Sequence, residues 1–144
     1  MAQALREGAW LYPIVEIVHI VGFTLLVGAA AMFDLRLLGF GRAVPVQALA
    51  RHLLPWSWCG LLLIVPSGLL MFSTQPALLD NGVFLLKLAL IAAAGVNALV
   101  FHAGPWRGAG RWQASAPAWA RLHAVLSLLL WIAVIACGRL LAYV

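Results

Sequence analysis

The stretch from Ile14 to Leu38 reads IVEIVHIVGFTLLVGAAAMFDLRLL and decides the fold. It is apolar for longer than the roughly 20 residues that a helix needs to cross a bilayer. Near its start it carries a carboxylate, Glu16, and an imidazole, His19, which lie on one helix face because they are three residues apart. Ionisable groups at membrane depth are costly, so we expect a role as ligand, proton relay or counter-ion. A histidine satisfied by a neighbouring helix is the alternative.

The composition excludes a soluble protein. Of the 144 residues, 65% are hydrophobic and 9% are charged, whereas a soluble domain is about half apolar and about a quarter charged. The net charge of +5 is spread over short loops and forms no basic stripe, which argues against a nucleic-acid partner. The chain is therefore predicted to be a single integral membrane domain, 1–144, whose partner is the lipid bilayer.

Four apolar runs predict four membrane spans, at about 14–38, 53–73, 83–103 and 118–143. Short connections make consecutive spans antiparallel neighbours, so we predict an all-α antiparallel four-helix bundle. Gly39 and Gly41 are expected to break the first helix, and residues 40–52 are expected to form a basic loop. The small residues 92–95 in the third span permit close approach of another helix. A homo-oligomer is compatible with this composition.

The arginines predict the orientation of the bundle. Six of the nine basic residues flank the loops that follow the first and third spans: Arg36, Arg42, Arg51, Arg107, Arg111 and Arg121. Because cytoplasmic loops carry the excess of lysine and arginine, both termini are predicted to face outward. In a bacterial inner membrane this places them in the periplasm.

Depth along the helices brings two groups together in the outer half of the bundle. His19 lies about 9 Å past Pro13 and Lys87 about 8 Å past Gly82, and both spans start at the same face. Lys87 can act as a neutral amine ligand, or it can form an ion pair with Glu16 that only joins two helices. Glu16 can also hold the second nitrogen of His19, as partners of ligand histidines do. Gly22 is expected to leave space for a flat macrocycle beside this pair.

Three histidines form an inner layer: His52, His102 and His123. Imidazoles on one side of a bundle can ligate a b-type haem or a soft metal, which makes this trio an alternative metal site. Histidines at helix ends near the membrane surface are also common without any ligand. His123 is the deepest of the three and the best single candidate.

Three segments resemble the CopD/HemJ-like group of small four-helix bacterial membrane proteins. They are HIVGFTLLVG from His19, SGLLMF (Ser67–Phe72) and FLLKLAL (Phe84–Leu90). The motifs FDLRLLG (Phe33–Gly39) and GR-x-x-AY (Gly138–Tyr143) resemble uncharacterised members. In HemJ-type protoporphyrinogen oxidases a first-helix histidine and a third-helix lysine are associated with haem, and the resemblance implies these roles for His19 and Lys87. The tyrosine–histidine pair of their third helix is missing here; Asn97 lies in that neighbourhood.

These observations give one leading hypothesis and two alternatives. The leading hypothesis is a haem-b-binding membrane protein that transfers electrons or oxidises a tetrapyrrole- or quinol-type substrate, which would make it a membrane oxidoreductase. The first alternative is copper binding or transport, for which CopD-like proteins provide the resemblance and Met32, Met71 and Cys59 the soft donors. The second is a membrane assembly subunit without a cofactor.

Overall fold

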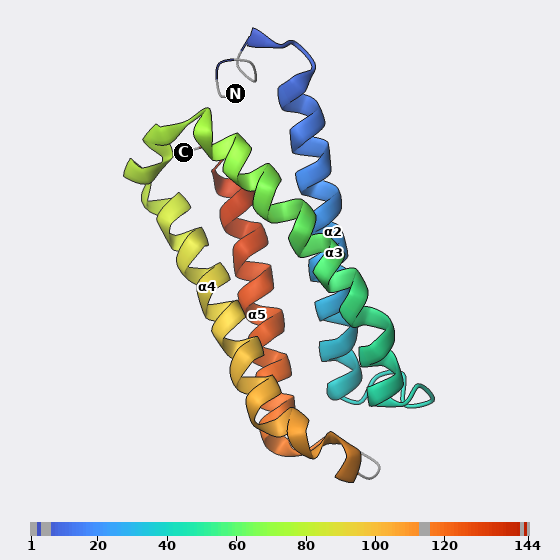
Figure 1. The fold of residues 1–144 in the computed structure, drawn as a ribbon. Coiled ribbons are helices and arrows are strands. Elements are labelled where there is room, and N and C mark those ends of the chain that lie inside the picture. The colour runs from blue at the N-terminus through green and yellow to red at the C-terminus, as the bar shows by residue number, and fades with distance from the viewer. Residues whose placement is uncertain (1–2, 4–6, 113–115, 142, 144) are drawn as a thin grey trace.

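The computed structural model describes residues 3, 7–112, 116–141 and 143, and these are largely helical. Figure 1 shows the long helices, whose bounds are α2 (Leu11–Leu37), α3 (Val46–Ser73), α4 (Gly82–Ala103) and α5 (Ala118–Leu140). Two 3₁₀ turns, η1 (Pro76–Asp80) and η2 (Pro105–Arg111), lie in the connections. The described residues contain no strand, so the predicted all-α fold is confirmed. Each of the four helices is long and apolar enough to cross a membrane.

Helix α3 begins earlier than predicted. The expected basic loop of residues 40–52 ends at Pro45, whose extended backbone precedes the first helical turn at Val46. Arg51 and His52 therefore lie within the helix. No glycine or proline interrupts the chain between Pro45 and His52, and the charge of Arg51 alone does not end a helix. The predicted break at Gly39 and Gly41 is confirmed, since both glycines have positive φ angles (109° and 67°) in the turn after α2.

The other helix ends differ by a few residues. Helix α2 starts at Leu11, and α5 ends at Leu140, before the predicted limit of residue 143. Residue 142 of that predicted span lies outside the described residues.

The closest helix contact joins α2 to α3 at two glycines. A Cβ atom added to Gly60 would lie 2.6 Å from the carbonyl oxygen of Gly22, and one added to Gly22 would lie 2.7 Å from the Cβ of Leu63. The two backbones therefore touch directly at this point. The prediction that Gly22 leaves space for a macrocycle is wrong, because α3 fills that space.

The bundle consists of two hairpins, α2 with α3 and α4 with α5, that meet through α2 and α5. Helices α3 and α4 make few direct contacts, and Figure 1 shows them diverging. The N and C termini and η1 lie at one end of the bundle, which we call the terminal end. The α2–α3 and α4–α5 connections lie at the other, which we call the loop end.

The loop end holds the best-packed core. Its buried residues are Leu37, Phe101, Ala116, Ala120 and Ala124. Aromatic rings pack around this cluster, with the Phe33 ring centroid 5.8 Å from that of Phe101 and 5.5 Å from that of Trp106. Of the small run in α4, Ala94 is buried but Gly95 faces open space, so the predicted close approach does not extend to Gly95.

Candidate functional site

His19 is half-buried on α2 and is held by a serine of α3. Its Nδ1 lies 3.0 Å from the Ser67 hydroxyl oxygen, which in turn donates to the Leu63 carbonyl at 2.5 Å. A hydroxyl has one hydrogen, and here the helix backbone accepts it. With the hydroxyl hydrogen on Leu63, His19 donates its Nδ1 hydrogen to Ser67, and in the neutral ring Nε2 then keeps a free lone pair. This is the tautomer in which an imidazole can bind a metal.

The fold leaves room for the His19 ring at a glycine. The Cε1 atom of His19 lies 3.3 Å from the position that a Cβ on Gly68 would occupy. Ser67 and Gly68 therefore act together: Ser67 accepts the hydrogen bond, and Gly68 leaves room for the Nδ1–Cε1 edge of the ring.

Lys87 reaches the same depth from α4. It is half-buried and lies close enough to His19 for the two side chains to interact electrostatically. Its Nζ lies 3.8 Å from the position of a Cβ on Gly138, so the amine is directed between α4 and α5. His19 and Lys87 thus lie within electrostatic range of one another. That they share one ligand stays a prediction.

Glu16 does not take the place expected for it. Its side chain is exposed on α2, and the hydrogen bond at His19 Nδ1 comes from Ser67 instead. Within the described chain no ion pair joins Glu16 to Lys87. A spacing of three residues places Glu16 on the same helix face as His19, but nearer the membrane surface, where the carboxylate can remain solvated.

Two of the three inner histidines are also held through Nδ1. His102 Nδ1 lies 2.8 Å from the carbonyl oxygen of Ala98 in its own helix. His123 Nδ1 lies 2.6 Å from Oδ1 of Asn97 on α4. The Asn97 Nδ2 in turn donates to the His123 carbonyl at 3.0 Å. Since a carbonyl only accepts, the Asn97 amide has one possible orientation, and His123 donates from Nδ1. His102 and His52 are exposed.

The three inner histidines do not lie close enough together to form a metal site made of protein side chains. Among the described residues, no three His, Cys, Asp or Glu side chains come close enough to hold a metal ion. The soft donors predicted for copper are also spread out. Met32 and Cys59 are exposed, and Cys59 is separated from Met71 by about 18 Å of helix.

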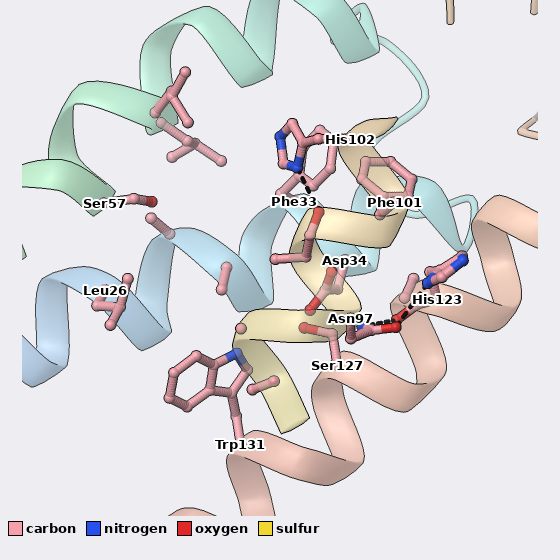
Figure 2. Close-up of a pocket in the computed structure, with 18 of the residues that line it drawn as sticks. Leu26, Phe33, Asp34, Ser57, Asn97, Phe101, His102, His123, Ser127 and Trp131 are labelled. Carbon is pink, nitrogen blue, oxygen red and sulfur yellow. Dashed lines mark hydrogen bonds between the residues drawn. The ribbon is translucent and has the colours of Figure 1, made fainter. Parts of the chain in front are cut away.

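A cavity of about 360 Å³ lies among all four helices towards the loop end. Its wall is largely apolar and aromatic, and includes Leu26, Phe33, Leu53, Leu61, Phe101 and Trp131. Figure 2 shows the polar groups at this wall, with the Asp34 and Ser127 side chains close together and the hydrogen-bonded Asn97 and His123 beside them.

Asp34 is the unexpected residue of this cavity. Its side chain is only 6% exposed, and its Oδ2 atom is buried without a hydrogen-bond partner. The Ser127 hydroxyl is placed to donate to the carboxyl group. The sequence showed Asp34 only as a residue near the end of the first span. The sequence feature that indicates burial of Asp34 is that apolar residues follow it, in the run FDLRLL.

Comparisons with known proteins add no relative. No protein-family model matches the chain, and neither a curated protein nor a solved structure gives a significant match. The functional assignment therefore depends on the chemistry of the two sites.

Proposed function

We propose that the protein binds haem b in the terminal half of the bundle, with His19 as the axial ligand, and acts in membrane redox chemistry. The observation that carries the proposal is the state of His19. It is a membrane-embedded imidazole whose Nδ1 is fixed by Ser67 and whose Nε2 is free. Histidines that bind metals are commonly fixed in this way through their other nitrogen. The resemblance of the first and third spans to HemJ-type proteins supports the same residue.

The donor chemistry of the site suits a haem iron. His19 offers one nitrogen ligand, and Lys87 brings an amine to the same depth. Because a protonated amine has no lone pair, Lys87 can ligate only after losing its proton; while charged, it can balance an anionic group nearby. Gly22 contributes no space for the group, since α3 covers it.

Each residue then has a defined task. His19 would hold the iron, Ser67 would orient His19, and the apolar helices would keep water from the site. Haem b, when bound, supplies the one-electron chemistry. This chemistry serves electron transfer or the oxidation of a tetrapyrrole- or quinol-type substrate, as the family resemblance implies.

The proposal includes a location in a bacterial inner membrane, with the loop end in the cytoplasm. The six arginines that flank the α2–α3 and α4–α5 connections support this orientation. Both termini, and the His19 site near them, would then lie on the periplasmic side.

Absorbance spectra of the purified protein supplied with haem b test the proposal. We expect a Soret band with reducible α and β bands in the wild type, and loss of haem or a high-spin spectrum in His19→Ala. Lys87→Ala should alter the spin state without necessarily removing the haem. His102→Ala is the matched control, because His102 is exposed and bonded only within its own helix. An unchanged spectrum in His19→Ala would overturn the proposal. Loss of the haem spectrum in His102→Ala alone would indicate that the haem binds at the loop end.

A further inference from the structure

We infer that the cavity at the loop end is a second site, built to bind a small lipophilic amine in its cationic form. The site is separate from the proposed haem site, because neither His19 nor Lys87 lines the cavity. Failure of either proposal therefore leaves the other intact.

The first observation is the unsatisfied carboxyl group. Asp34 is 94% buried, since its exposed fraction is 6%, and its Oδ2 has no hydrogen-bond partner. A buried polar group without a partner is destabilising, and a charged one more so. Native structures rarely retain such a group without a use for it. A ligand that donates a hydrogen bond to Asp34 would remove this cost.

The second observation is the charge of the cavity wall. Asp34 is its one acidic residue, and the lining found in the described chain includes no lysine or arginine. Its two histidines are His123 and His102, and His102 Nδ1 is bonded to the Ala98 carbonyl of its own helix. Asn97 and His123 already bond to each other and do not compete for the carboxyl group. The carboxylate charge is shared by both of its oxygens, so a cation placed anywhere beside it is attracted. The site thus favours a positive ligand over an anion or a neutral acceptor.

The third observation is the nature of the remaining wall. Aromatic side chains of all four helices line the cavity: Phe33 of α2, Trp58 of α3, Phe101 of α4 and Trp131 of α5. Aromatic faces attract cations and also bury apolar groups, so they suit a molecule that carries both. The volume of about 360 Å³ lies within the range of small-molecule sites.

The ligand can enter from the membrane. The residues that α3 and α4 contribute to the wall include the exposed Trp58, Leu61, Gly95 and Ala98, and the two helices make few contacts. The cavity therefore opens sideways between α3 and α4, at the surface that faces lipid. An amphiphilic amine dissolved in the bilayer can reach Asp34 by this path without crossing the bundle.

Two probes of the same shape test the charge requirement: naphthylmethylamine, which is a cation, and naphthylmethanol, which is neutral. Binding to the full chain in lipid nanodiscs is measured by calorimetry, with empty nanodiscs as the baseline. We expect saturable binding of the amine and at least about tenfold weaker binding of the alcohol, because a charge-assisted hydrogen bond is lost. Asp34→Asn should weaken amine binding at least about tenfold and leave alcohol binding unchanged. Asp80→Asn, which changes an exposed carboxylate in η1, should affect neither.

A pair of glycine variants locates the binding independently of Asp34. A Cβ at Gly95 or at Gly28 meets nothing within 4 Å, so both positions accept a larger side chain. Gly95 lines the cavity and Gly28 does not. Gly95→Leu should therefore reduce amine binding, whereas Gly28→Leu should not. The inference is overturned if the wild type shows no saturable amine binding, if the alcohol binds as tightly as the amine, or if Gly95→Leu has no effect. Equal binding of the two probes would indicate a neutral ligand such as a quinol.

Discussion

The contact between α2 and α3 gives a sharp stability prediction. In Gly60→Ala the new Cβ would lie 2.6 Å from the Gly22 carbonyl oxygen and 2.8 Å from the Leu26 nitrogen. Both neighbours are backbone atoms in the middle of a helix, so they cannot turn aside as a flexible side chain would. Ordinary contact begins near 3.4 Å, and the two helices must therefore separate locally by about 0.8 Å.

The cost follows from two opposing terms. Overpacking in a tight interface destabilises by about 1–3 kcal/mol. Replacing glycine by alanine inside a helix stabilises by up to about 1 kcal/mol. Gly60→Ala should therefore range from neutral to about 2 kcal/mol less stable than the wild type. Gly95→Ala is the matched control, because it carries the same chemical change in a helix but meets no neighbour within 4 Å. Gly95→Ala should keep the full stabilisation that alanine gives inside a helix. The free energy of unfolding should therefore differ by about 1–3 kcal/mol between the two variants.

Reversible unfolding in mixed micelles measures this difference. Dodecyl sulfate is titrated into the folded protein, and the loss of structure is followed by tryptophan fluorescence and circular dichroism. The comparison between the variants is more secure than either absolute value, since the denatured reference is the same. Equal stability of Gly60→Ala and Gly95→Ala would refute the direct backbone contact between α2 and α3.

Three further predictions concern the polar groups and the topology. Ser67→Ala removes the acceptor of the His19 Nδ1 hydrogen, so haem affinity in titrations should fall about 10–100-fold; an unchanged affinity would show that Ser67 does not orient the ring. Asn97→Leu leaves the Nδ1–H of His123 without its partner, whereas the His123 carbonyl keeps its acceptor role within α5, so the change should cost about 1–3 kcal/mol, seen as an earlier unfolding midpoint. A wild-type midpoint would contradict that role. A phosphatase reporter fused to the C-terminus should be active in the periplasm, whereas strong fluorescence of a green fluorescent protein at the same position would reverse the orientation.

The spans could be predicted from the sequence, because each depends on counting along one helix. Apolar runs long enough to cross a bilayer define the four helices, and Gly39 and Gly41 mark the turn after the first. The rise per residue placed His19 and Lys87 at one depth before the helices were arranged in space.

Contacts between helices could not be predicted in the same way. A membrane helix is apolar on most of its faces, so periodicity does not indicate which face meets which neighbour. The partner of His19 is Ser67, 48 residues away, and not Glu16, one turn away. Gly22 is expected to provide space but provides contact, because the outcome depends on the rotation of α3.

Asp34 was missed for a related reason. An acidic residue near the end of an apolar run, followed closely by Arg36, is typical of the membrane boundary. In the structure α2 ends at Leu37, close to the predicted limit, and Arg36 donates to the Val44 carbonyl of the following loop. The arginine therefore points away and leaves Asp34 buried among the four helices without a basic partner from its own helix.

The haem content of the purified protein is the most direct test of the central proposal, that His19 holds a haem iron. The wild type and His19→Ala are produced with haem supplied, and haem is measured per chain by conversion to its pyridine complex. The account predicts about one haem per wild-type chain and little or none in His19→Ala, with both proteins equally helical. Equal haem in the two proteins, or none in the wild type, would contradict it.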